Sequence, residues 1–304
     1  AIALAVTLAS GCTLIPDYQR PAAPVPARFP GATQVDAAVP ADAIAWRDYF
    51  ADTKLREVIA LALAHNRDLR VAALNIEQAR ALYRIQRADL FPAIDAIGGQ
   101  SAQRLPGGLT SSGEADVVRT YSATVGLSAY ELDFFGRIRS LNAQALELYL
   151  GTEEARRSAQ ISLVAEVANA WLTLAYDRER LALAQRTYDT RLKSHELIRR
   201  SAEAGAVSAL DLHQSQTLLQ SARADVARFA AFAAQDENAL ALVAGTQVPA
   251  ELLPDSLGGS VNAVADLPAG VPSEVLARRP DILLAERALR AANANIGAAR
   301  AAFF

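Results

Sequence analysis

Apolar residues in the middle of the chain follow a helical period over a long distance. No proline occurs between Arg137 and Ala204. As one helix these residues would reach roughly 100 Å, which is far longer than the helices of a globular domain. The apolar positions step by three and four, the spacing of a coiled-coil seam. They are Leu163, Val167, Ala170, Leu174, Leu181, Ala184 and Tyr188.

A short turn separates this predicted helix from a second one. Gly205 supplies a helix stop, and Ser208 followed by Asp211 is the pattern of a capping box, in which both side chains satisfy amides at the start of the next helix. That helix extends to about Ala244, because apolar residues repeat every seven positions at Leu212, Leu219, Val226, Ala233 and Leu240. A turn of a few residues predicts an antiparallel helical hairpin. The longer helix extends beyond the end of the shorter one. The simplest element to pack against this extension is a second copy of the same unit.

A period of two replaces the helical period from Thr120 to Leu132. One face of this predicted strand is apolar and consists of Tyr121, Ala123, Val125, Leu127 and Ala129. The residues of the opposite face are small and uncharged. A half-buried strand of a soluble sandwich gives the same alternation, but about ten residues of it is the length of a tilted transmembrane β-strand. The predicted partner strand is Ala93 to Arg104, joined by a loop from Leu105 to Val117. Two strands cannot close a barrel, so a barrel requires further copies.

The first residues have the pattern of a processed and lipid-anchored N-terminus. Ala1 to Ala9 is a short apolar run, which we interpret, as residues 1–11, as the remnant of a signal peptide. The run ends in small residues and Cys12, an order that resembles a bacterial lipobox, so we predict lipidation at Cys12; the alternative is a free thiol. Residues 12–45 carry repeated prolines and few periodic apolar positions, which predicts an extended arm.

The chain contains an internal repeat. A shift of 213 positions aligns Asp68-Leu69 with Asp281-Ile282 and Arg87-Ala88 with Arg300-Ala301, without a gap. We therefore expect residues 46–249 to be a first repeat and residues 250–304 to be a linker with the start of a second, so that the chain is part of a duplicated protomer.

Composition excludes several classes of function. The 304 residues are 52% hydrophobic and carry a formal net charge of −3, so the chain has no electrostatic footprint for nucleic acid. His65, His195 and His213 lack the spacing of a metal site, although His195 and His213 could approach each other across the hairpin. No nucleotide, dinucleotide or hydrolase motif is present. We therefore expect no metal, no cofactor and no catalytic residues.

Several blocks of sequence together resemble the outer-membrane channel components of tripartite efflux pumps. This is the TolC-like superfamily, and within it the lipoprotein branch that includes OprM. The blocks are Pro16 to Pro21, Trp46 to Phe50, Asn66 to Leu69, Ala88 to Pro92, Tyr130 to Arg137 and Arg278 to Ile282.

The resemblance implies a mainly α protein with a membrane β part. In that family a homotrimer builds one outer-membrane β-barrel continued by a periplasmic α-barrel tunnel. An inner-membrane transporter of the RND type supplies the energy, and a periplasmic adaptor, or membrane fusion protein, contacts the tunnel tip. Carried onto this chain, the adaptor-facing tip comprises Arg200, Gly205, Ser208 and Asp211. Gate residues belong largely to the second repeat and are not assigned.

Two other functions fit parts of the pattern. A periplasmic coiled-coil adaptor would share the helical hairpin but has no need of a strand with one lipid-suited face. An outer-membrane channel for type I protein secretion would share the whole architecture and differ in its cargo.

Overall fold

A computed structural model describes residues 13–22, 24–25, 44–109, 111, 113–257 and 273–304. Cys12, residues 1–11 and most of the predicted arm lie outside these ranges. The helices are α2 (Trp46–Tyr49), α3 (Thr53–His65), α4 (Arg67–Ala88), α5 (Arg137–Glu203), α6 (Ala209–Ala244) and α7 (Pro280–Ala301). The strands are β1 (Ala93–Leu105) and β2 (Asp116–Ala129), and short 3-10 turns are η2 (Gly107–Leu109), η3 (Ala250–Leu252) and η5 (Ser273–Arg278). No helix within these ranges is long and apolar enough to cross a membrane.

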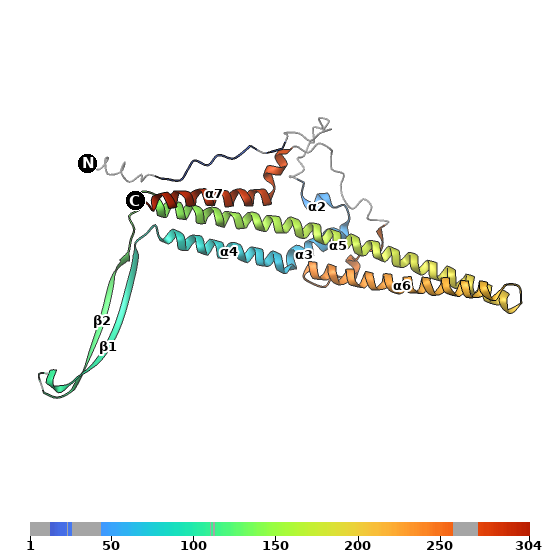
Figure 1. Ribbon diagram of the computed structural model, residues 1–304, viewed down its shortest axis with the longest axis horizontal. Helices are drawn as coiled ribbons and strands as arrows, with labels where there is room; N and C mark the ends of the chain where they lie inside the picture. The colour runs from blue at the N-terminus through green and yellow to red at the C-terminus, as the bar shows by residue number, and fades with distance from the viewer. Residues whose placement is uncertain (1–12, 23, 26–43, 110, 112, 258–272) are drawn as a thin grey trace. The chain divides into compact units, whose positions relative to one another are not determined.

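The predicted helical hairpin is confirmed as α5 and α6, which run antiparallel on either side of one tight turn (Figure 1). α5 ends one residue before the predicted position. Every residue of the two predicted seams is buried or half-buried, because the seam of each helix faces the other helix or the elements packed beside it.

The strand prediction is correct in kind and wrong in its bounds. β2 begins at Asp116 instead of Thr120 because its first four residues pair with the end of β1, at Ala102 to Leu105. It ends at Ala129 instead of Leu132 because Ala129 pairs with Ala93, the first residue of β1. Pro92, the residue before Ala93, has no N–H with which to extend the backbone hydrogen bonds between the strands.

The chain divides into two compact units. One contains residues 1–21, 76–152 and 285–304, and the other contains residues 22–75 and 153–284.

In the second unit, α3 and η3 close over α5 and α6 around a hydrophobic core. Its largest fully buried side chains are Trp171, Leu55, Ile59, Leu174 and Leu240. The indole Nε1 of Trp171 donates a hydrogen bond to the carbonyl oxygen of Leu252 at 3.0 Å. At the end of α6, Gly245 has φ +75°, and a Cβ there would lie 2.4 Å from the carbonyl oxygen of His65. Only glycine permits this close passage of the chain beside α3.

In the first unit, two helices flank the beginning of α5. Arg80 of α4 donates to the hydroxyl of Tyr149 at 3.2 Å, and Arg287 of α7 donates to Glu147 at 3.0 Å. Both flanking helices have 22 residues, with bounds that differ by the 213 positions of the repeat. The beginning of α5 is thus flanked by α4 and by α7.

The core gives a first testable prediction. Trp171→Ala should lower the free energy of unfolding by about 3–5 kcal/mol, because it leaves a cavity in a closely packed core. Trp171→Phe should cost about 1–2 kcal/mol, chiefly through the unpaired carbonyl oxygen of Leu252. Denaturant unfolding followed by circular dichroism measures both. Leu197→Ala, at a side chain that is 68% exposed, is the control and should stay within about 0.5 kcal/mol of the parent.

Candidate functional site

The strand hairpin has two chemically different faces. Side chains directly opposite each other in an antiparallel pair lie on the same face. The register places Ile94 opposite Leu127 and Ala96 opposite Val125. The predicted apolar face of β2 therefore continues onto β1, where the sequence pattern was weak. The other face carries mostly small and polar residues, such as Gly99 opposite Ser122 and Ser101 opposite Thr120, and it includes a large apolar side chain, Ile97.

The described side chains of the predicted membrane face are exposed in this chain. Tyr121, Val125 and Leu127 are between 70% and 75% exposed, and Ala123 is exposed as well. The side chain of Ala129 is outside the described set. Gln100 donates to the hydroxyl of Tyr121 at 3.3 Å, which closes the apolar stretch with a polar pair. An exposed, well-paired hairpin with one apolar face is suited to an apolar environment or a partner surface.

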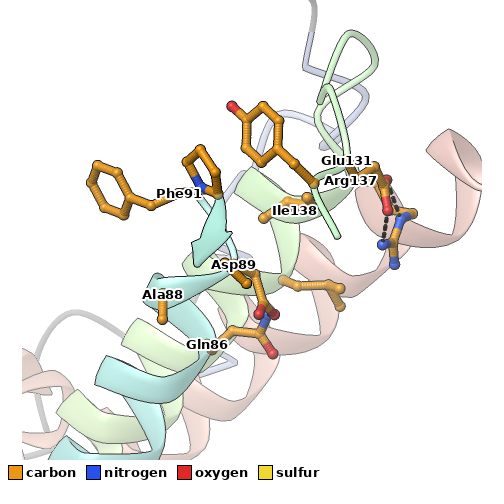
Figure 2. Close-up of a pocket in the computed structure, with 11 residues that line it drawn as sticks. Gln86, Ala88, Asp89, Phe91, Glu131, Arg137 and Ile138 are labelled. Carbon is orange, nitrogen blue, oxygen red and sulfur yellow. Dashed lines mark hydrogen bonds and ion pairs between the residues drawn. The ribbon is translucent and has the colours of Figure 1, made fainter. Parts of the chain in front are cut away.

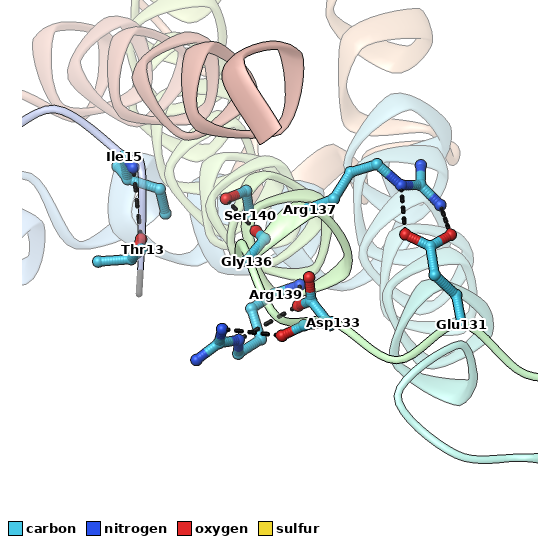
Figure 3. A network of polar contacts seen from close by, with 8 residues as sticks. All are labelled: Thr13, Ile15, Glu131, Asp133, Gly136, Arg137, Arg139 and Ser140. Carbon is cyan, nitrogen blue, oxygen red and sulfur yellow. Dashed lines mark hydrogen bonds and ion pairs between the residues drawn. The ribbon is translucent and has the colours of Figure 1, made fainter. Parts of the chain in front are cut away.

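Two ion pairs fix the passage from β2 into α5 (Figure 3). Arg137 binds Glu131 with both Nε and Nη2, in a bidentate geometry. Asp133 accepts from the backbone N–H of Arg139 at 2.9 Å and from its Nε at 3.2 Å, so it caps the free amides at the start of the helix. The hydrogen bond from Arg137 lowers the pKa of Glu131. Burial opposes ionisation of Asp133, but the bonds from Arg139 outweigh it and lower its pKa.

An open cavity of about 650 Å³ lies beside this junction (Figure 2). It is formed by the end of α4, the start of β1, the segment after β2 and the first turn of α5. Arg137, Glu131 and Asp89 are its charged residues. Sequence reasoning did not identify this cavity, because nothing in the sequence shows that residues 86–93 and 130–141 meet.

The predicted tip residues cluster at the turn between α5 and α6. Gly205 has φ +75°, a conformation that favours glycine, and Arg200 is exposed in the last turn of α5. The predicted capping box is confirmed: Ser208 Oγ accepts from the N–H of Asp211 at 3.2 Å, and Asp211 accepts from the N–H of Ser208 at 3.1 Å. Hydrogen bonds from Ser208 lower the pKa of Asp211. The turn is therefore a rigid, polar end of the hairpin.

A pair of carboxyl groups lies between the two long helices. Asp177 of α5 is buried and binds Arg180 at 3.1 Å. Burial and the neighbouring Asp177 together raise the pKa of Asp236 on α6. Asp236 lies three positions after Ala233 of the α6 seam, and nothing in the sequence shows that an acidic residue of α5 stands opposite.

The histidines do not meet. The Nδ1 atom of His195 lies 2.8 Å from Ser215 Oγ, and not beside His213 as the sequence allowed. Ser215 donates to the carbonyl oxygen of Leu212, so its hydroxyl accepts from His195. Among the residues that the structure describes, no three His, Cys, Asp or Glu side chains are grouped to hold a metal ion.

Known proteins resemble the chain over nearly its whole length. Residues 58–246 match the family described as outer membrane efflux protein. The probable efflux pump outer membrane protein TtgC of Pseudomonas putida is 50% identical over 309 residues, which cover 100% of this chain and 64% of TtgC. A membrane protein from Pseudomonas aeruginosa of known structure is 43% identical, with a TM-score of 0.82 over 96% of this chain and 66% of that one. The open state of the MtrE outer membrane channel of Neisseria gonorrhoeae is 37% identical, with a TM-score of 0.75 over 96% of this chain and 64% of that one.

The carboxyl pair predicts a pH-dependent effect on stability. The pKa of Asp236 in the folded chain is above its ordinary value of 3.8, so its contribution favours folding below that value and is lost as pH rises through the raised pKa. Asp236→Asn should therefore unfold at a higher temperature than the parent at pH 7, and the two should converge near pH 3.5. Thermal unfolding across this range is the measurement. Asp189→Asn on the exposed side of α5 serves as control, and an equal gain there would contradict the assignment.

Proposed function

This chain belongs to the outer membrane efflux protein family, and on that premise we propose that it forms the exit duct of a tripartite efflux pump. The duct passively conducts drugs or other small molecules from the periplasm and the transporter to the exterior. The family is one of efflux ducts and not of enzymes. The chain spans 64% of the length of TtgC. The exit-duct activity is therefore a proposal about the whole protein.

The strand hairpin is the observation that carries this proposal. Its strands have 13 and 14 residues and pair in one register from Ile94 to Leu105, with a shift at Ala93; one face is apolar and the other carries mostly small and polar residues. Lipid-facing and lumen-facing residues alternate in this way in transmembrane β-barrels. Among the residues that the structure describes, each strand has one edge without a partner, and within a bilayer such an edge must pair. A homotrimer whose copies contribute further strands satisfies that requirement.

The helical hairpin supports the proposed partners. Its turn is rigid and exposed, and it ends in the polar groups Arg200, Ser208 and Asp211. We propose that this end meets a periplasmic adaptor, behind which an RND-type inner-membrane transporter supplies the energy. The same proposal places the protein in the outer membrane, anchored through a lipid on Cys12 and extending into the periplasm. We also propose that residues 46–249 form a first structural repeat and that residues 250–304 are a linker with the start of a second.

Conductance of the full-length protein tests the exit-duct proposal. Purified from outer-membrane fractions and added to a planar lipid bilayer, the trimer should give stepwise ion currents. Leu127→Asp, placed on the proposed lipid face, should reduce membrane insertion, whereas Thr124→Asp on the opposite face should leave insertion intact and change ion selectivity. A protein that fractionates as a water-soluble monomer without conductance would instead favour the periplasmic adaptor alternative.

The tip proposal has its own test. Arg200→Glu should reduce drug resistance conferred by the reconstituted pump several-fold and weaken crosslinking to the adaptor, because it reverses charge at the docking end. Trimer assembly should persist, since Arg200 is exposed. Arg223→Glu on α6 is the matched charge reversal away from the tip and should retain resistance. Full resistance in the Arg200→Glu strain would remove the docking role.

A further inference from the structure

The cavity at the strand–helix junction combines an apolar wall with a small number of charged groups. The wall is made by Phe91, Pro92, Tyr130, Ile138 and Leu141. The charged groups are Asp89, Glu131 and Arg137, as Figure 2 shows. A concave, mainly apolar site with a few polar groups is the usual form of a small-molecule site, and about 650 Å³ falls within the usual size range.

The charged groups keep hydrogen-bonding capacity after their internal contacts are made. Arg137 uses Nε and Nη2 for Glu131, and its Nη1 has no hydrogen bond to any residue that the structure describes. Asp89 accepts from Gln86 Nε2 through Oδ2 at 2.8 Å, and its Oδ1 remains available. The Tyr130 hydroxyl likewise has no partner within the described ranges. The cavity thus presents cationic and phenolic donors together with an anionic acceptor.

The position of the cavity indicates what kind of molecule reaches it. The apolar face of the hairpin starts at Ile94 and Leu127, directly beyond the cavity. On the other side α4 ends and α5 begins. Phe91, Tyr130 and Phe134 are exposed at this level, and aromatic side chains of membrane proteins concentrate at the depth of lipid headgroups. This step depends on the exit-duct proposal, which puts the hairpin in a bilayer.

We propose that the cavity binds the phosphoethanolamine headgroup of a membrane phospholipid. The ammonium group donates to Asp89, and the phosphate accepts from Arg137 and the Tyr130 hydroxyl. The glycerol and the first acyl carbons lie along Phe91 and Pro92.

The charge balance selects a zwitterion over an anion. Glu131 stays ionised because Arg137 lowers its pKa, and it neutralises that guanidinium. An anionic headgroup without an amine would bring its negative charge against Asp89 with no compensating cation. Phosphatidylcholine keeps the positive charge but has no N–H to donate, so it loses the charge-assisted hydrogen bond to Asp89.

Lipid retention by the full-length trimer tests this site. The protein is reconstituted in nanodiscs that contain equal amounts of phosphatidylethanolamine, phosphatidylcholine and phosphatidylglycerol, and bound lipids are counted by native mass spectrometry. The parent should retain phosphatidylethanolamine about tenfold over each of the others. Asp89→Asn should abolish this preference and Tyr130→Phe should weaken it. Asp189→Asn is the control, because Asp189 has a matching hydrogen bond from Gln185 on α5 but no such cavity.

Separate readouts keep this proposal distinct from the channel proposal. If the parent conducts ions but retains the three lipids equally, or retains phosphatidylglycerol best, the headgroup site is rejected and the duct stands. An Asp89→Asn trimer with unchanged preference rejects the site as well. If the parent neither conducts nor fractionates with the outer membrane, the duct proposal fails. Loss of preference in an Asp89→Asn trimer that assembles and conducts normally supports both.

Discussion

The architecture depends on the need to cover one very long helix. α5 has 67 residues, and its apolar seam from Leu163 to Tyr188 would face water if the helix stood alone. From residue 153 onward, α6 and the short helix α3 close over it around Trp171 and Leu240. Before that point, α4 and α7 flank it through Tyr149 and Glu147. Each other described helix longer than two turns therefore covers some part of α5.

The strand hairpin differs from the helices in how it is stabilised. Nearly all of its described side chains are exposed, on both faces, and no other described segment pairs with the outer edge of either strand. Such an element is not stabilised by a core of its own. What holds it in place is its base, where Glu131 and Asp133 bind the first turn of α5 and bring the chain from strand into helix. The base is also where apolar and polar surfaces meet, and the cavity beside it carries both signs of charge.

Polar groups in the coiled-coil seam modify the helical hairpin without breaking it. Ser215 binds His195, and Asp236 faces Asp177, both at positions that a dry seam would fill with apolar residues. Polar residues at seam positions cost stability and help to define register. The capping box at Ser208 and the left-handed Gly205 fix the far end of the same hairpin. The turn is consequently set by local chemistry and the register by contacts across the helices.

Local pattern determined the elements of this protein. The helical period of α5 and α6, the capping box and the alternation in β2 each depend on neighbours along the chain, and the match to the outer membrane efflux protein family agrees with the resemblance carried by the sequence blocks. The tertiary structure alone decided which distant residues meet. Val117 belongs to β2 because Arg104 pairs with it, Ile94 shares the apolar face because Leu127 lies opposite, and Asp89 reaches the cavity of Arg137 because two segments about 45 positions apart converge there. Hydrophobic periods specify which face of an element is buried, but they carry no information on which partner covers it.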